Sequence, residues 1–313
     1  MTNVNEKSYR PITLADYKGQ EKTKKLIKVY LAAAQRRGEC LDHVLISGPS
    51  GCGKSTLAGV LANEMGGKLL ASNGMTLKKN EDIYNIFDQI EEGTILFIDE
   101  IQALPKKLQE VFYTAMEDFF YDYMEEGEFS TRKFLPHFTL VAATNEVGGL
   151  SEAMSNRFPI KIILNPYSVS EMANIVMQSC GKLGMDISIE AAELVGKASR
   201  GVPRVANGIV RRVSDFAVLF NDNFIDIDVV NEAFDLMEIN SEGFNRNDMN
   251  YLKCLANSRK PMGIDSIAIS INLDRKTVEN AIEPYLLANG YVYRTPRGRC
   301  LTEKGVKSVK EFV

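Results

Sequence analysis

Features that would direct a protein to a membrane, a metal or an oxidising compartment are missing from this chain of 313 residues. No run of about 18 apolar residues occurs, which argues against a membrane-spanning helix, and the polar N-terminus has no apolar segment typical of a secretory signal. Its two histidines, His43 and His137, have no neighbours at metal-ligand spacing. The five cysteines lie far apart without a CxxC pair, as reduced thiols do in cytosolic proteins. We therefore expect a cytoplasmic protein without zinc, disulfides or a membrane anchor.

Negative charge slightly exceeds positive charge in the whole chain, but the balance reverses at the C-terminal end. The formal net charge is −4, yet the residues from Glu242 onward hold 12 Lys and Arg against 8 Asp and Glu, a net of +4 that leaves −8 on the rest. Three of these arginines fall within YRTPRGR, residues 293–299. A basic module on an acidic body predicts that the C-terminal part binds a polyanion.

Short apolar runs alternate with helical patterns in the N-terminal half. Buried strands of a parallel sheet are unbroken runs of apolar and β-branched residues. Such runs are HVLIS (43–47), TILFID (94–99), FTLVAAT (138–144) and IKIIL (160–164), and KLLAS (68–72) reads as one further strand. Helical periodicity separates them, for example in EDIYNIFDQIEEG. The alternation predicts an α/β domain with a parallel sheet over residues 1–166.

The rest of the chain changes pattern twice. Residues 167–240 follow helical periodicity throughout, which predicts a small helical domain. In residues 241–313, two helices joined by a short turn precede two β-rich stretches around Pro296 and Gly298. Helix, turn, helix and hairpin is the order of elements in a winged helix.

A glycine-rich segment after the first predicted strand fits the phosphate-binding pattern GxxxxGK[ST]. Gly51 and Gly53 let successive backbone N–H groups turn toward phosphate oxygens, at the positive end of the following helix. Lys54 is then placed to reach the β- and γ-phosphates, and the Ser55 hydroxyl to ligate Mg²⁺. Because the segment follows a strand and opens a helix, it predicts an ATP site rather than an ordinary glycine turn.

Acidic and polar residues end two other predicted strands. The carboxyl ends of parallel strands meet at one edge of a sheet, so Asp99 and Glu100, at the end of LFIDE, are expected beside the phosphates. Asp99 would hold the Mg²⁺ shell, and Glu100 would orient and polarise the attacking water. Asn145, which ends AATN, is a candidate for a hydrogen bond to the γ-phosphate or the water. Together these residues predict an ATP hydrolase.

The segments GPSGCGKST, LFIDE, AATN, the RF of SNRFP, and GVPR occur in the order found in AAA+ ATPases. More narrowly, the chain resembles the RuvB family of bacterial Holliday-junction branch-migration motors, from Arg10 to Thr302. The stretches VPRVANGIVRRVSDFA and EPYLLANGYVYRTPRGR are especially specific, because they link this helical domain and this winged helix to this ATPase. The resemblance implies an AAA+ P-loop NTPase core, a helical lid and a C-terminal winged-helix domain, assembled as a hexameric ring on duplex DNA.

The resemblance also assigns roles to single residues of the ATPase. Asn145 would be sensor 1 and Arg204 sensor 2, and Arg157 would be an arginine finger that completes the neighbouring subunit's site. Arg10 and Tyr167 match nucleotide-contacting positions. The residues implied to bind the phosphates and Mg²⁺ are Gly51, Gly53, Lys54, Ser55 and Thr56. A stretch that matches the family near the subunit contact is Glu117, Asp118 and Phe119.

The arginines of YRTPRGR match the DNA-binding wing of the family. The resemblance assigns phosphate contacts to Arg294 and Arg299, and Arg297 lies between them at the turn of the hairpin. Such contacts hold the protein on DNA without reading its sequence. The alternative is that these arginines pair with carboxylates of their own domain, for which Glu283 and Glu303 are candidates.

The chain departs from the family most clearly after AMEDFF. There the family has an apolar hairpin that docks its junction-binding partner RuvA, whereas YMEEGEFSTRKFLPHF is shorter and carries Glu125, Glu126 and Glu128. In DEIQAL, Gln102 stands where the family has a histidine. These differences suggest a divergent member, such as one carried by a phage or a mobile element, with altered docking of that partner.

Three functions agree with these features. The first is an ATP-driven motor that translocates duplex DNA at Holliday junctions in recombination and repair. The second is an AAA+ loader that places another protein, such as a replicative helicase, on DNA. The third is a DNA-binding scaffold whose assembly ATP controls, and the intact Glu100 and Arg157 argue against it. The motor is the function that the resemblance favours.

Overall fold

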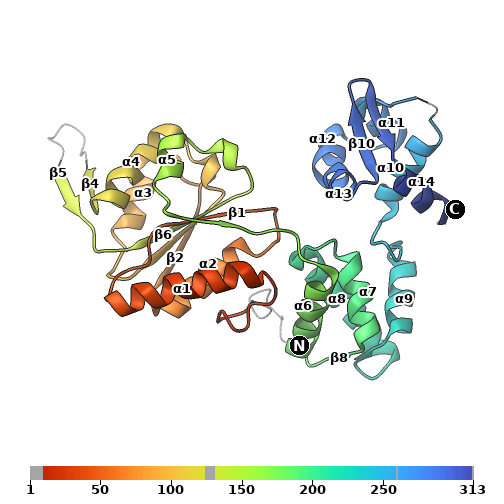
Figure 1. The fold of residues 1–313 in the computed structure, drawn as a ribbon, viewed down its shortest axis with the longest axis horizontal. Coiled ribbons are helices and arrows are strands. Elements are labelled where there is room, and N and C mark those ends of the chain that lie inside the picture. The colour runs from red at the N-terminus through yellow and green to blue at the C-terminus, as the bar shows by residue number, and fades with distance from the viewer. Residues whose placement is uncertain (1–9, 124–130, 259, 312–313) are drawn as a thin grey trace. The chain divides into compact units, whose positions relative to one another are not determined.

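A five-stranded parallel sheet organises the N-terminal half of the computed structural model, which describes residues 10–123, 131–258 and 260–311 (Figure 1). Across the sheet, the strands are β2 (Leu69–Asn73), β3 (Ile95–Asp99), β6 (Thr139–Thr144), β1 (Val44–Ser47) and β7 (Ile160–Ile163). All neighbouring pairs are parallel. The three central strands are buried along almost their whole length, which explains their unbroken apolar sequences. The predicted α/β fold is confirmed.

Helices cover both faces of this sheet (Figure 1). On one face lie α1 (Glu21–Arg37) and α2 (Lys54–Met65), and on the other α3 (Asn80–Phe87), α4 (Lys106–Glu117) and the short α5 (Glu152–Asn156). Two single 3₁₀ turns, η2 (Ile101–Ala103) and η3 (Val147–Gly149), follow β3 and β6. The loops at this carboxyl edge of the sheet therefore begin from rigid strands.

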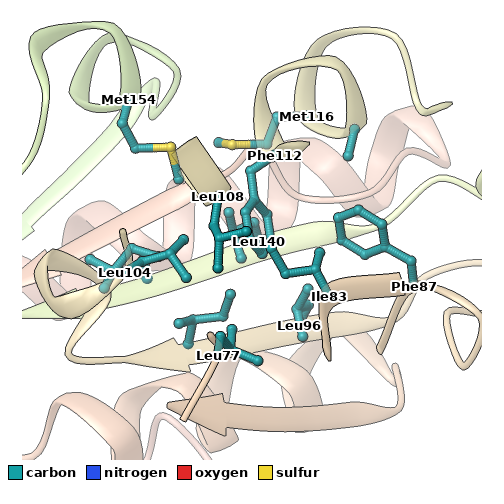
Figure 2. Close-up of a cluster of buried hydrophobic side chains, with 14 of the residues drawn as sticks. Leu77, Ile83, Phe87, Leu96, Leu104, Leu108, Phe112, Met116, Leu140 and Met154 are labelled. Atoms are coloured by element: carbon teal, nitrogen blue, oxygen red, sulfur yellow. The ribbon is translucent and has the colours of Figure 1, made fainter. Parts of the chain in front are cut away.

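An apolar core fills the space between the sheet and the helices α3 and α4 (Figure 2). In α4, Leu108, Phe112 and Met116 recur every four residues and are all buried, so they line one face of the helix. Figure 2 shows this face directed toward Leu96 of β3 and Leu140 of β6. Burying one side chain of this size contributes roughly 1.5–3 kcal/mol. Packing on this scale holds the strand ends in fixed positions.

A hairpin follows α4. Its strands are β4 (Phe120–Tyr123) and β5 (Thr131–Phe134), which pair antiparallel. Arg132 pairs across the hairpin with Asp122 at 3.1 Å. The three acidic residues that distinguish this segment from the family's apolar hairpin lie outside the described residues, and they are Glu125, Glu126 and Glu128.

The chain divides into two compact units, the first of which ends at Glu171 and also takes in Gly201–Val205. The second unit holds Met172–Arg200 and the described residues from Ala206 onward. Its first half is helical, as predicted from the sequence. The elements here are α6 (Val169–Lys182), β8 (Asp186–Ile187), α7 (Ile189–Ala198), α8 (Pro203–Phe220), β9 (Phe224–Ile225) and α9 (Ile227–Leu236).

The second half of this unit is a winged helix, which confirms the predicted fold. Its elements are α10 (Arg246–Ala256), α11 (Ile264–Ser270), α12 (Arg275–Thr277), a π-helical turn (Val278–Ile282), α13 (Glu283–Ala288), β10 (Val292–Thr295), β11 (Gly298–Leu301) and α14 (Glu303–Glu311). The π-helical turn ends two residues before Pro284, a residue that cannot donate a backbone hydrogen bond to the helix before it. An apolar core that includes Tyr251, Ile267 and Leu286 joins the helices to the hairpin.

Arg200 connects the helical part of the second unit to its winged helix. It stands between α7 and α8 in the left-handed conformation, with φ 58°. Its guanidinium donates to the carbonyl of Gly243 at 3.0 Å, forms an ion pair with the buried Asp248, and lies 4.5 Å from the centroid of the Tyr285 ring. Breaking a mostly buried charge pair is costly, so these contacts join the end of α7 to the start of the winged helix.

Within the described ranges, no helix is long and apolar enough to cross a membrane. The same ranges contain no group of three or more His, Cys, Asp or Glu side chains that could hold a metal ion. All five cysteines are free thiols.

Candidate functional site

The glycine-rich loop connects the end of β1 to the start of α2, at the carboxyl edge of the sheet. Gly51 and Gly53 have φ values of 82° and 98°, which residues with a side chain rarely adopt. A Cβ atom on Gly51 would lie 2.8 Å from Cγ1 of Val202, and one on Gly53 would lie 2.9 Å from the hydroxyl oxygen of Tyr17. Glycine is therefore needed both for the backbone turn and for space. This is the construction of a loop whose N–H groups face a phosphate.

Lys54 opens α2 with its side chain folded back onto the loop. The residue is only 7% exposed, and its ammonium donates to the carbonyls of Gly48 at 2.8 Å and Pro49 at 3.2 Å. A cation at the positive end of a helix is unfavourable by itself, so the site favours an incoming anion. Ser55 and Thr56 follow on the first helical turn and are partly exposed.

Arg204 lies on the same loop, although about half the chain separates them in sequence. It belongs to the short segment that clusters with the sheet rather than with the second unit. Its backbone N–H donates to the carbonyl of Gly51 at 3.3 Å, and its guanidinium donates to the Ser50 hydroxyl at 3.4 Å. A second cation is thus brought to the loop, at the position that the family resemblance assigned to sensor 2.

Two buried tyrosines support the loop. The hydroxyl oxygens of Tyr17 and Tyr167 are 3.0 Å apart, and that of Tyr167 lies 3.3 Å from the carbonyl oxygen of Cys52. Burial raises the pKa of Tyr17 to about 12 and also raises the pKa of Tyr167, so both keep their protons near neutral pH. The backbone N–H of Tyr167 donates to the carbonyl of Gly201 at 2.9 Å. Tyr167 therefore links the loop to the segment that carries Arg204.

The two acids and Asn145 also reach this edge of the sheet. β6 lies between β3 and β1, so the residues that follow these strands are neighbours. Asp99 ends β3, and its Oδ1 accepts the backbone N–H of Glu100 at 3.0 Å. The amide nitrogen of Gln102 donates to Oδ1 of Asn145 at 2.8 Å and to the carboxylate of Glu100. The strand order thus places the acids, the amide and the phosphate loop along one edge of the sheet, and hydrogen bonds through Gln102 join Glu100 to Asn145.

Arg157 lies toward the opposite edge of the sheet. It comes three residues before β7, which runs parallel to β1, whereas the phosphate loop follows β1. The four residues of β1 span about 13 Å, a distance that exceeds the reach of an arginine side chain. The Arg157 guanidinium instead pairs with Glu117 at 3.2 Å and lies 4.0 Å from the centroid of the Tyr113 ring. It cannot complete the phosphate site of its own chain.

The two arginines paired across the wing hairpin converge on one carboxylate. Arg294 and Arg299 are partners in the β10–β11 register, and they donate to Glu283 at 2.6 and 2.7 Å. Glu283 is 0% exposed and also accepts the hydroxyl of Tyr251 at 2.8 Å. Burial raises the pKa of Glu283, but the hydrogen bonds from both arginines and Tyr251 outweigh burial and lower it below the usual range. The carboxylate is therefore ionised and fastens the wing to α13.

The three candidate DNA-binding arginines differ in how freely they can meet a phosphate. Arg297, at the turn of the hairpin, is exposed. The side chain of Arg294 is 54% exposed and makes one hydrogen bond to Glu283, whereas that of Arg299 is 16% exposed and makes two. The pairing that the sequence left open, with Glu283 or Glu303, is made with Glu283. Arg297 is thus the one of the three that is exposed and is not a partner of Glu283.

The remaining predicted residues lie around these central contacts. Arg10 is exposed at the start of the described residues. Asp118 and Phe119 directly follow α4. They therefore lie next to Glu117, the residue that pairs with Arg157. Tyr17 was not predicted from the sequence to support the loop, because it lies in a segment before the first predicted strand that carries no phosphate-binding motif.

Family models match almost the whole chain. Residues 9–164 match the model described as "Holliday junction DNA helicase RuvB P-loop domain". Residues 167–240 match "RuvB AAA lid domain", and residues 241–310 match "RuvB C-terminal winged helix domain".

Relatives agree along the same length. The chain is 40% identical over 302 residues to "Holliday junction branch migration complex subunit RuvB" of Campylobacter fetus, covering 96% of this chain and 88% of that protein. A protein of the same name in Campylobacter hominis is 40% identical over 303 residues, covering 96% and 89%. A solved structure of the Thermotoga maritima RuvB Holliday junction branch migration motor is 37% identical, with a TM-score of 0.83 over 97% of this chain and 98% of that one. From its phosphate loop to its wing, this chain belongs to the RuvB family.

Proposed function

We propose that this chain is the ATP-driven motor of a branch migration complex, which hydrolyses ATP to move duplex DNA at Holliday junctions. The names of its relatives in Campylobacter and of the similar Thermotoga motor support this assignment. The observation that carries it is the position of Glu100, at the carboxyl edge of the sheet and joined through Gln102 to Asn145. A protein that only bound nucleotide would need no acid there to polarise water.

In this proposal the loop residues hold the triphosphate of ATP. The Lys54 ammonium, which lies on two loop carbonyls, would turn to the β- and γ-phosphates. Gly51, Gly53 and Thr56 would present backbone N–H groups. Arg204 would add a second cation from the segment Gly201–Val205, which contacts the loop at Ser50. Arg10 and Tyr167 are proposed to lie near the rest of the nucleotide, on the strength of the family resemblance.

The oxygen atoms at the site suit Mg²⁺. A hydroxyl from Ser55 and a carboxylate from Asp99 are the hard ligands that this ion prefers, and both side chains are partly exposed. The backbone N–H of Glu100 fixes the orientation of the Asp99 carboxylate. When bound, Mg²⁺ would neutralise charge on the β- and γ-phosphates.

Hydrolysis would require a second copy of the chain. Glu100 would orient and polarise the attacking water, and Asn145 would donate to the γ-phosphate or to the water. Because Arg157 cannot reach its own loop, we propose that it enters the site of a neighbouring subunit in a homo-oligomeric, hexameric ring. Its ion pair with Glu117 then holds it at the proposed subunit contact, together with Asp118 and Phe119.

The winged helix would hold the DNA track. Arg297 and Arg294 are proposed to meet phosphates first, and Arg299 is proposed to contact DNA from its place beside Glu283. Phosphate contacts carry no sequence information, which suits a motor that moves along any sequence. The acidic residues between β4 and β5 would resist burial against an apolar partner surface. We therefore propose weak binding to a standard RuvA protein that lacks a basic face.

Movement of a synthetic four-way junction by the purified chain tests this function. We expect ATP-dependent conversion of the junction into duplex products, with and without a RuvA-type partner in parallel reactions. Glu100→Gln serves as the control that binds ATP without turning it over. ATP hydrolysis without junction movement, combined with ATP-dependent delivery of another protein to DNA, would support the loader instead.

A further inference from the structure

A glutamine two residues after Glu100 contacts two members of the proposed hydrolysis site. Gln102 lies in the 3₁₀ turn Ile101–Ala103, directly after β3. Its amide nitrogen donates one hydrogen to Oδ1 of Asn145 at 2.8 Å and the other to Oε2 of Glu100. Both protons of the amide are therefore used, and they join side chains that follow two different strands.

The two acceptors decide which way the Gln102 amide points. Turning it over would place its carbonyl oxygen against the Glu100 carboxylate and the Asn145 carbonyl, which offer no donor. In the observed orientation Oε1 of Gln102 is buried, and it has no hydrogen-bond partner among the described residues. An unpaired buried acceptor is costly. The orientation persists because the bonds to Glu100 and Asn145 outweigh that cost.

The backbone around Gln102 leaves this side chain little freedom. Glu100 has φ 49°, in the left-handed region, so the chain turns sharply where β3 ends. On the other side lies Gly149, at the end of the turn that follows β6. A Cβ atom there would be 2.9 Å from Cβ and 3.4 Å from Cγ of Gln102. The glycine allows the two turns to close on the aliphatic part of the glutamine.

This arrangement determines which atoms remain available for chemistry. With its Oδ1 taken by Gln102, the amide of Asn145 must direct its N–H₂ group elsewhere, where it can donate to a phosphate oxygen or to water. With Oε2 held, the Glu100 carboxylate keeps Oε1 to accept a proton from water. We propose that Gln102 is a positioning residue for ATP hydrolysis, which fixes the Glu100 carboxylate and the Asn145 amide as one unit around the attacking water. The inference rests on the proposed ATPase function.

The first test removes both donors while keeping the length of the side chain. In Gln102→Met we expect kcat for ATP hydrolysis to fall about tenfold or more, because a hydrogen bond to a charged group is lost. The KM for ATP and the affinity for a non-hydrolysable ATP analogue should not change, since Gln102 holds no phosphate. The matched control is Gln89→Met, in an exposed glutamine that donates to the carbonyl of Asn85 at 2.7 Å, and it should behave as wild type.

Two further variants separate positioning from simple packing. Gln102→His restores a ring N–H donor and the residue that the family carries, so its kcat should lie between those of wild type and Gln102→Met. Gln102→Glu keeps the shape but removes both donors and sets a second carboxylate beside Glu100, so its kcat should fall at least as far as that of Gln102→Met. If Gln102 only filled space, Gln102→Met would keep the wild-type kcat and Gln102→His would show no gain over it.

The outcomes decide between the proposals. If the Gln102→Met protein had an unchanged melting temperature and a wild-type kcat, the positioning role would be overturned. It would also be overturned if this variant bound the ATP analogue more weakly while its kcat stayed the same. ATPase activity and junction movement are measured on the same wild-type preparation. Hydrolysis without movement would reject the motor and leave the Gln102 test intact. A wild-type chain without ATPase activity would overturn both.

Discussion

Replacing Glu283 with glutamine is expected to loosen the wing from the helix that precedes it. The carboxylate is fully buried and receives hydrogen bonds from Arg294, Arg299 and Tyr251. Glutamine has the same shape and still offers one carbonyl oxygen, but it brings no charge to balance two guanidinium groups. The change therefore removes the electrostatic part of this contact and spares its packing.

The structure sets the size of the effect. Breaking a buried ion pair by removing one partner costs roughly 3–5 kcal/mol. Arg294 is 54% exposed, so water screens most of its share, whereas Arg299 is 16% exposed and loses its main partner. With one acceptor oxygen retained, we expect Glu283→Gln to lower the free energy of unfolding of the winged helix by about 2–3 kcal/mol.

Hydrogen exchange of the full chain in increasing urea is the suitable assay, because it follows the winged helix separately from the rest. The matched control is Glu303→Gln, in an exposed glutamate at the start of α14, for which we expect a change within about 0.5 kcal/mol. If Glu283→Gln lowered the free energy of unfolding of the winged helix by no more than Glu303→Gln does, the buried carboxylate would not hold the hairpin. If peptides from the unit that contains the five-stranded sheet lost the same amount of protection from exchange, the effect of the substitution would not be local to the winged helix.

Four other predictions concern the chemistry, the assembly, the DNA contact and pH. Glu100→Gln should keep ATP bound and stop steady-state turnover, because only the activation of water is removed. Arg157→Ala should bind nucleotide but lose on the order of 10³-fold in hydrolysis rate, and mixing it with Lys54→Ala subunits should restore some activity at mixed interfaces. Arg297→Ala should weaken duplex binding on all sequences and lower the slope of log K against log salt by about 0.9. Since the pKa of Glu283 lies below its ordinary value of 4.5, its stabilisation is complete above about pH 4.5 and fades as pH falls through the lowered pKa. Urea midpoints between pH 7 and pH 3 should therefore fall further for wild type than for Glu283→Gln.

Each of these has an outcome that contradicts it. Normal turnover in Glu100→Gln would remove that residue from catalysis. Mixed rings, shown independently to form, that recover no activity would argue against Arg157 acting between subunits. An unchanged salt slope in Arg297→Ala would mean that the tip of the hairpin is not on the DNA, and parallel urea curves for wild type and Glu283→Gln across pH would mean that this carboxylate does not titrate as inferred.

The sheet could be predicted from the sequence because its signal is local. A strand buried on both faces must be apolar at every position, and the run at 94–99 became β3, Ile95–Asp99, while the run at 138–144 became β6, Thr139–Thr144. The phosphate loop was equally readable, since its function depends on glycine and lysine at fixed spacing. In such segments the residues that need each other are neighbours in the chain.

Contacts between distant residues were not readable in the same way. The sequence offered both Glu283 and Glu303 as partners for the wing arginines, and only the placement of α13 beneath the hairpin selects Glu283. The link from Gln102 to Asn145 depends on β3 lying beside β6, a fact of sheet order rather than of spacing. Tyr17 supports the loop from a segment with no motif of its own.

The contacts of Arg200 have a consequence for exchanging parts between relatives. Its guanidinium is tied to Gly243 and Asp248 of the winged helix, while the next residue, Gly201, begins the segment that carries Arg204. In a hybrid protein whose residues from 241 onward came from a relative, Arg200 would remain but its partner Asp248 would be replaced. A cut that transfers Arg200 together with Asp248 respects the ion pair. The best junction for such a hybrid therefore lies before Arg200, and not at residue 241, where the sequence pattern changes.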